Sequence, residues 1–285
     1  MCICVFKRYE LKYVLTPAQY EAVLARAAAR LRPDEYGRTT IQSLYYDTDD
    51  FRLIRRSIEK PEYKEKLRLR SYGLAGADDR VFLELKKKCS GVVYKRRIET
   101  TPRALANGET NGGQIGREID YFEKFYGDLR PKALLIYDRE AYFGEGDLRV
   151  TFDHNVRYRT EALTLGTGLY GTSLFSRGEV LMEIKTGAAI PLWLTKILSE
   201  ERIYKTSFSK YGAAYEREAE KKLLEVKKHI AIFLAVLIRC FVFLLETCFR
   251  TDRITFLKLS AVALLLFSCS GFFIAHFVNY LIKTK

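Results

Sequence analysis

Histidine, tryptophan and proline are scarce in this 285-residue sequence, which has 3 His, 1 Trp and 6 Pro. The six Cys residues lack the paired spacing of a structural zinc site, since Cys2 and Cys4 are too close together and have no His partner. Several other Cys residues fall in apolar runs, so we expect no disulfide framework and a reducing compartment. The low Pro count and 18 Gly exclude collagen-like and low-complexity chains, and 48% hydrophobic residues argue against disorder.

Acidic residues are also under-represented relative to basic ones. The chain has 48 Lys and Arg against 35 Asp and Glu, a formal net charge of +13. Residues 230–285 hold six of the basic and two of the acidic residues, which leaves 42 against 33, or +9, in residues 1–229. A basic region of that size predicts an anionic partner, either nucleic acid, a lipid surface or a phosphorylated small molecule.

Long apolar runs occur only near the C-terminus. The run Leu259–Val278 has 20 residues without a formal charge, enough to cross a hydrocarbon core of ~30 Å at ~1.5 Å per residue. The run Ile230–Phe249 has the same length but contains Arg239 and Glu246, two helical turns apart on one face. It is either a second span that packs its charged face against a partner, or an amphipathic helix at the interface. Since the connection at 250–258 is short, two spans would form a helical hairpin.

The sequence therefore predicts two parts, a body over residues 1–229 and a membrane-embedded tail over 230–285. Lysines precede the first run and further basic residues occupy the connection, which weakly favours a cytoplasmic body anchored to the membrane: Lys221, Lys222, Lys227, Lys228, Arg250, Arg253 and Lys258. The first residues of the chain are already charged, so no signal peptide is expected there.

The body has the pattern of an antiparallel sheet with a few helices. Eight segments read as strands: 6–14, 41–47, 62–72, 80–89, 92–100, 133–143, 148–158 and 179–187. Thr16, Pro17 and Gln19 form a capping box that predicts a helix, which ends before Pro33. Further helices are expected over 117–126, after Pro191 and over 207–228.

Charged residues alternate along four of these strands. They share one face in each case: Lys64, Lys66, Arg68 and Arg70; Glu84, Lys86 and Lys88; Arg149, Thr151 and Asp153; Glu183 and Lys185. A sheet with one wet face would also alternate, but clustered like charges on neighbouring strands repel. An eight-stranded barrel with its basic faces inward and its apolar faces under helices accounts for the pattern, if a chain of phosphates fills the narrow interior.

Eight segments, in order, resemble the triphosphate tunnel metalloenzyme (CYTH-like) superfamily, and within it the VTC-type polyphosphate polymerase domain. They cover roughly residues 6–217 and include Arg8-Tyr9-Glu10-Leu11-Lys12-Tyr13, Tyr45-Tyr46-Asp47-Thr48, Leu67-Arg68-Leu69-Arg70, Leu83-Glu84-Leu85-Lys86, Tyr137-Asp138-Arg139-Glu140-Ala141-Tyr142, Leu148-Arg149-Val150-Thr151-Phe152-Asp153, Leu181-Met182-Glu183-Ile184-Lys185 and Ser207-Phe208-Ser209-Lys210-Tyr211. The resemblance implies an α+β fold, an eight-stranded antiparallel β-barrel (the triphosphate tunnel) with flanking helices, followed here by the helical tail. It also implies a transferase that moves the γ-phosphate of ATP onto inorganic polyphosphate with Mn²⁺, or Mg²⁺, and no role for nucleic acid.

By the same resemblance, a set of basic residues matches the family's phosphate-binding positions: Lys12, Arg68, Arg70, Lys86, Lys95, Arg139, Arg149 and Lys210. Lys185 and Ser209 are added to the expected ATP contacts, and Glu183 matches the metal ligand. Planar Arg side chains suit phosphate because they donate two hydrogen bonds to it. Which of Lys95, Arg96 and Arg97 faces the tunnel is left open, because a one-residue register slip exchanges faces.

One departure bears on the activity. Triphosphatases and cyclases of the superfamily open with Glu-x-Glu-x-Lys, whereas this chain has Arg8-x-Glu10-x-Lys12. Replacing the first Glu by Arg removes a metal ligand and adds a phosphate contact, which favours the polymerase. The alternatives are a tripolyphosphatase of the same fold and a non-catalytic sensor that binds polyphosphate or an inositol polyphosphate. Translocation of polyphosphate would need self-association or a membrane-protein partner, since two helices enclose no pore.

Overall fold

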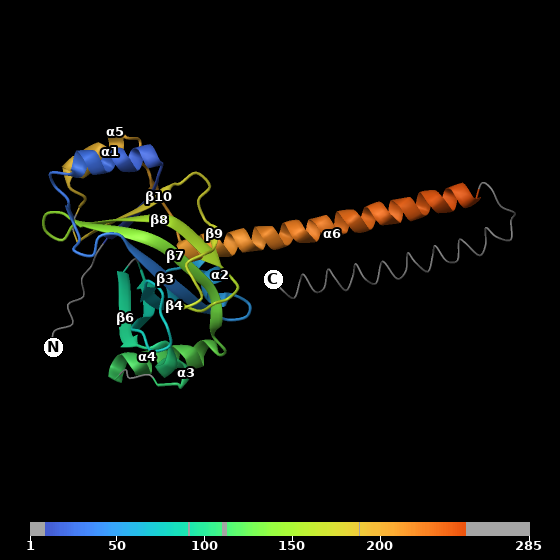
Figure 1. Cartoon of the computed structure of the whole chain (residues 1–285), viewed down its shortest axis with the longest axis horizontal. Coiled ribbons are helices and arrows are strands. Elements are labelled where there is room, and N and C mark those ends of the chain that lie inside the picture. Colours follow the sequence, from blue (N-terminus) through green and yellow to red (C-terminus); the bar gives the residue numbers. More distant parts are fainter. Residues whose placement is uncertain (1–8, 91, 110–112, 188, 249–285) are drawn as a thin grey trace. The chain divides into compact units, whose positions relative to one another are not determined.

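The computed structural model describes residues 9–90, 92–109, 113–187 and 189–248 (Figure 1). The chain divides into two compact units, residues 1–215 and 216–285. The predicted boundary at 229/230 stays a prediction. Within the described residues there are eight long strands, one for each predicted segment: β1 (Tyr9–Leu15), β3 (Thr39–Asp47), β4 (Tyr63–Tyr72), β5 (Val81–Cys89), β6 (Val92–Thr100), β7 (Arg130–Phe143), β8 (Arg149–Arg159) and β10 (Val180–Thr186).

These strands form one antiparallel sheet in the order β11-β1-β10-β8-β7-β3-β4-β5-β6. The short strand β2 (Arg32–Pro33) pairs with β7, β9 (Thr172–Ser173) pairs with β8, and β11 (Lys205–Thr206) pairs with β1. The predicted closed barrel is wrong in one respect. In the part of the chain that the structure describes, β1 and β6 do not pair, because the second edge of β1 is taken by β11, with Lys12 opposite Thr206.

The open sheet is nevertheless strongly curved. β1 and β5 are far apart in the strand order, yet Lys86 Nζ of β5 lies 3.5 Å from Glu10 Oε2 of β1. Side chains from both ends of the sheet therefore meet over its concave face. The prediction that the basic sides of the strands face one another inside the fold is confirmed, although the sheet is not closed.

Helices cover the convex face and bury its apolar side chains. α1 (Pro17–Ala27) and α5 (Leu192–Glu200) share an apolar core with β1, β8 and β10, in which Phe152 and Met182 are fully buried. α3 (Pro102–Ala106) and α4 (Gly113–Tyr126) lie over β4, β5 and β6, where Phe122 of α4 packs in the cluster that holds Leu67 and Leu83. Figure 1 shows the two helix pairs on opposite sides of this unit.

The capping box predicted for α1 is confirmed. Thr16 Oγ1 accepts the Gln19 backbone N–H at 3.2 Å, and Gln19 Oε1 accepts the Thr16 backbone N–H at 3.0 Å. Pro17 occupies the first helical turn, where its missing N–H costs nothing.

Helix α2 (Arg52–Ile58) had not been predicted, and a buried carboxylate explains it. Asp47, at the end of β3, accepts the backbone N–H groups of Leu53 at 2.8 Å and Ile54 at 3.0 Å. These N–H groups are at the start of a helix, where no intrahelical acceptor exists. Asp47 also accepts the Tyr211 hydroxyl at 2.9 Å, so it links β3 and α2 to the start of α6 (Lys210–Cys248).

Helix α6 (Lys210–Cys248) begins three residues later than predicted and continues without a break through the first apolar run as far as it is described. Among the helices of the described residues, none combines the length and apolarity that a membrane span requires. The two alternatives for the run Ile230–Phe249, a span or an interfacial helix, stay predictions. The run 259–278 and the hairpin connection lie outside the described residues.

Candidate functional site

The concave side of the sheet carries a dense group of cations, which we call the basic face. Strand register places on it Lys12, Lys64, Lys66, Arg68, Arg70, Lys86, Lys95, Arg97, Arg139 and Lys185, and Lys210 reaches it from the start of α6. Four carboxylates lie among them: Glu10, Glu84, Asp153 and Glu183. Positive charge therefore exceeds negative charge on this face.

Glu84, on β5, is the centre of a cluster of four cations. It is 1% exposed and accepts Arg68 Nε at 2.8 Å, Arg97 Nε at 2.7 Å and Lys95 Nζ at 2.7 Å, with Arg70 NH1 at 3.9 Å. Burial alone would raise the pKa of Glu84, but Arg68, Arg70 and Lys95 outweigh it and hold the pKa far below the ordinary carboxyl value. Glu84 thus stays ionised and fixes these cations in place.

Asp153, on β8, likewise holds two cations in place at the other side of the basic face. Both of its oxygens accept the guanidinium of Arg139, at 2.5 and 2.8 Å, and Lys210 Nζ also donates to it. Asp153 is fully buried, and Arg139 and Lys210 keep its pKa low against the effect of burial. It joins β7, β8 and the first residue of α6.

Glu183, the predicted metal ligand, is held more loosely. Its oxygens lie 3.4 Å from Lys210, 3.5 Å from Lys185, 3.6 Å from Lys12 and 3.7 Å from Arg139. Burial would raise the pKa of Glu183, but Lys210, Lys12, Lys185 and Arg139 hold it well below its usual range. An ionised carboxylate with such long contacts keeps lone pairs for a further cation.

The basic face could hold a divalent cation only with help from a ligand. No group of three or more His, Cys, Asp and Glu suitable for a metal occurs in the described part of the chain. Glu183 offers hard carboxylate oxygens, which Mg²⁺ and Mn²⁺ prefer. Glu10 is its neighbour, because Lys12 Nζ lies 3.4 Å from Glu10 and 3.6 Å from Glu183. The donor set therefore fits a metal whose remaining ligands are phosphate oxygens and water.

The register settles which of three consecutive cations of β6 faces inward. Lys95 and Arg97 both reach Glu84, whereas Arg96 Nε points to the opposite side and donates to Glu118 of α4 at 3.0 Å. The question that the sequence left open is thereby answered: Lys95 and Arg97 face inward, and Arg96 faces the helices.

Arg149 is the predicted site residue whose side chain lies farthest from the centre of the basic face. Register places it beside Lys185, but its side chain is 41% exposed and its guanidinium lies 3.5 Å from Asp34 and over the ring of Phe143. Its Nε is buried without a hydrogen-bond acceptor among the described residues. Arg149 therefore marks the end of the basic face, not its centre.

Tyrosines border the basic face. The Tyr45 hydroxyl accepts Arg68 NH1 at 3.1 Å, its ring stacks on Tyr211 with centroids 4.7 Å apart, and Tyr137 accepts Arg70 NH2 at 3.0 Å. Burial would raise the pKa of Tyr45, but neighbouring cations, chiefly Arg68, lower it to about 8. These contacts fix the orientation of the two central arginines.

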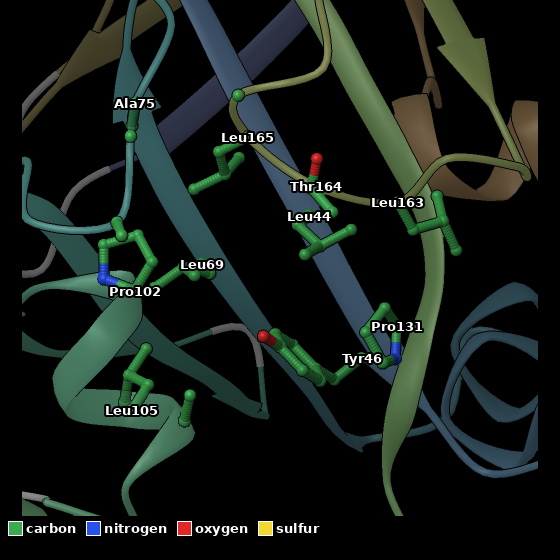
Figure 2. Close-up of a pocket in the computed structure, with 14 residues that line it drawn as sticks. Leu44, Tyr46, Leu69, Ala75, Pro102, Leu105, Pro131, Leu163, Thr164 and Leu165 are labelled. Carbon is green, nitrogen blue, oxygen red and sulfur yellow. The ribbon is translucent and has the colours of Figure 1, made fainter.

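A separate apolar cavity of about 500 Å³ lies on the convex face (Figure 2). Leu44 and Leu69 of the sheet, Leu105 of α3 and the loop residues Leu163 and Leu165 line it. The strand alternation turns Leu44 and Leu69 away from the basic face, so this cavity does not belong to the charged site.

Sequence reasoning missed several residues of the basic face. Lys66 had the correct alternation but was not chosen, because no motif contained it. Glu84 and Asp153 appeared in the motifs without a role, since only the fold shows which cations they hold. Arg97 needed the register, which the sequence left open.

The chain was compared with known proteins by structure and by sequence. Solved structures with similarity include a putative adenylate cyclase from Vibrio parahaemolyticus, with 11% identity and a TM-score of 0.40 over 73% of this chain and 97% of that one. A putative adenylyl cyclase from Hippeastrum, HpAC1, described as having a dominant triphosphatase activity, has 17% identity and a TM-score of 0.42 over 71% and 92%. The PH1819 protein from Pyrococcus horikoshii OT3 has 15% identity and a TM-score of 0.38 over 73% and 99%.

The sequence comparisons are more specific. No curated protein matches the chain. The family described as VTC domain matches residues 7–218, well over half of the chain. The chain therefore belongs to the VTC domain family.

Proposed function

We propose that the protein is a polyphosphate polymerase, an ATP–polyphosphate phosphotransferase that adds the γ-phosphate of ATP to a growing inorganic polyphosphate chain. The excess of cations over carboxylates on the basic face, where Arg70, Arg139 and Lys210 are largely buried and the other cations partly exposed, is the observation that carries the proposal. Uncompensated buried charge is costly, so a site with this surplus requires an anion. A chain of phosphates supplies many negative charges in a narrow strip, which matches the arrangement along the strands.

The cations bind and orient the phosphates. Arg68 and Arg70 have rigid guanidinium groups that Glu84, Ser43 and Tyr137 hold in place, so they lose little freedom when they bind phosphate oxygens. Phosphoryl transfer depends mainly on in-line positioning and on neutralising charge on the equatorial oxygens. Preorganised donors at fixed positions provide both.

The metal requirement follows from Glu183. When Mn²⁺ or Mg²⁺ is bound, it supplies charge neutralisation at the transferring phosphate. Glu183 would hold the ion through its carboxylate, while Lys12, Lys185 and Lys210, now paired with Glu183, turn to phosphate oxygens. No general base is needed in the polymerase, because the accepting oxygen of a phosphate chain is already ionised.

Two further functions use the same basic face. A tripolyphosphatase would accept water in place of the growing chain, and a sensor would bind polyphosphate or an inositol polyphosphate without turnover. The Arg8 substitution in the first motif supports the polymerase over the hydrolase, and a carboxylate that is free to bind a metal supports an enzyme over a sensor. Membrane anchoring by residues 230–285 with a cytoplasmic body, and association with itself or with a membrane protein, complete the proposal.

The full chain incubated with ATP and Mn²⁺ tests it. Products are separated on a gel and stained for polyphosphate, and free phosphate is measured in parallel with tripolyphosphate as substrate. Chain growth is the expected result. Release of free phosphate without chain growth would identify a tripolyphosphatase, and binding without either product would identify a sensor.

A further inference from the structure

Lys66 lies in the middle of the basic face without an anionic partner. It is directly opposite Lys86 in the β4–β5 register, and the next inward pair along these strands is Lys64 with Lys88. Like charges directly opposite one another destabilise a sheet. Among the described residues no carboxylate lies within ion-pair distance of Lys66, whose ammonium group donates instead to the Ser209 hydroxyl at 3.0 Å.

This sets Lys66 apart from the lysines predicted to bind phosphate. Those lysines each have a carboxylate close by: Lys12, Lys86, Lys95, Lys185 and Lys210. They are held in position before a ligand binds, and they must leave a carboxylate to contact it. Lys66 has only a neutral hydroxyl, so binding an anion costs it no existing ion pair.

We propose that Lys66 is a phosphate-binding residue of the basic face, and that it and the Ser209 hydroxyl together contact one phosphate of the condensed-phosphate chain. The proposal rests on the proposed function in so far as it takes that chain as the ligand. The Ser209 hydroxyl accepts both Lys66 Nζ and the Gly212 backbone N–H at 3.1 Å, so its own proton is available to a phosphate oxygen.

The surroundings of Lys66 also predict proton uptake. Burial lowers its pKa to about 8; Tyr45 opposes this, while Lys12, Lys86 and Lys64 add to it. A bound phosphate would raise that pKa again. At pH 8.5 a substantial fraction of Lys66 in the free protein would be neutral, so binding should take up protons at this residue.

Calorimetric titration of the full chain with tripolyphosphate, in EDTA and therefore without turnover, tests the assignment. Lys66→Met should lower affinity about 10- to 100-fold, the loss of one charged hydrogen bond. It should also melt no lower than wild type, because it removes an unpaired buried charge. Lys87→Met is the matched control. Lys87 follows the inward-facing Lys86 on β5, so its side chain lies on the convex side, 3.7 Å from Glu65.

Titrations at pH 8.5 in two buffers of different ionisation enthalpy measure the protons taken up. Lys66→Arg keeps a permanent charge, so it should bind while taking up fewer protons than wild type. Equal proton uptake by both proteins, or unchanged affinity in a folded Lys66→Met variant, would overturn the proposal. If the wild-type protein does not bind tripolyphosphate at all, both this proposal and the proposed function are overturned. If tripolyphosphate binding depends on Lys66 but no chain grows from ATP, only the polymerase activity is overturned.

Discussion

Replacing Glu84 by Gln is the sharpest test of how the basic face is built. The substitution keeps the shape of the side chain but removes the charge that Arg68, Lys95 and Arg97 share. Removing one partner of a buried ion pair costs about 3–5 kcal/mol. Lys95 and Arg97 are 42% and 35% exposed and can turn to water, so we expect the lower end, about 3 kcal/mol.

That loss is measurable as a fall in melting temperature. In a unit of residues 1–215, about 1 kcal/mol corresponds to about 2–4 °C, so Glu84→Gln should melt roughly 6–12 °C below wild type. Tripolyphosphate should recover more of the melting temperature in the variant than in wild type, because the released cations then pair with the ligand. Turnover should fall, because Arg68 and Lys95 lose the acceptor that orients them.

The pH dependence provides a second readout. Because the pKa of Glu84 is depressed in the folded protein, its contribution to the free energy of unfolding is present above about pH 4.5 and is lost as the pH falls further. The Gln variant should lose less stability than wild type on acidification below that pH. Thermal unfolding measured by circular dichroism at several pH values shows the difference.

Glu65→Gln is the control for Glu84→Gln. Glu65 is also a buried carboxylate, but it faces the convex side, where it accepts the hydroxyl of Tyr126 at 2.8 Å. The Glu65→Gln variant should have a lower melting temperature than wild type, but tripolyphosphate should raise the melting temperature of the two proteins by the same amount. If the ligand stabilises Glu84→Gln no more than it stabilises Glu65→Gln, then Glu84 does not hold cations for an anion and the reasoning is wrong.

Three further predictions test the metal ligand, the alternation and the tail. Glu183→Gln should lower turnover by orders of magnitude and nucleotide affinity much less, because the cations still hold the phosphates; wild-type turnover at saturating Mn²⁺ would remove Glu183 from the site. Arg68→Ala should weaken tripolyphosphate binding about 10- to 100-fold, whereas Leu69→Ala should cost about 2–5 kcal/mol of stability at unchanged affinity, as calorimetry and thermal melts would show; the reverse result would refute the assigned faces. Residues 1–229 should be soluble and synthesise polyphosphate, while the full chain should sediment with membranes until detergent is added; a full chain that stays in the supernatant contradicts the membrane prediction.

The strands could be predicted from the sequence because their signal is local. Alternation of period two placed Arg68 and Arg70 on one side of β4 and Leu67 and Leu69 on the other, and the structure has this arrangement. The capping box at Thr16 was equally local. These features depend on residues within one strand or one helical turn, so no knowledge of the rest of the fold was needed.

Features that depend on distant contacts could not be predicted. Helix α2 begins after Phe51 at φ 60° without a side-chain hydrogen bond from that cap residue, and its first N–H groups are accepted by Thr48 and Asp47 from the turn and strand before it. The open edge of the sheet follows from β11, a two-residue strand too short to have a sequence pattern. The roles of Glu84 and Asp153 appeared only when strands far apart in the chain were brought together.

The unpaired side of β6 has a consequence for how the protein behaves in a crowded cell. An exposed strand edge offers free N–H and C=O groups to strands of other chains and so promotes aggregation. In the described part of the chain β6 ends the sheet, and it carries three consecutive cations, Lys95, Arg96 and Arg97. Lysine and charged side chains on edge strands disfavour such pairing, because a second copy would bring its own cations against them. Lys95 and Arg97 on the basic face and Arg96 on the other face should thus disfavour pairing between copies, and neutralising all three should increase aggregation, apart from any effect on activity.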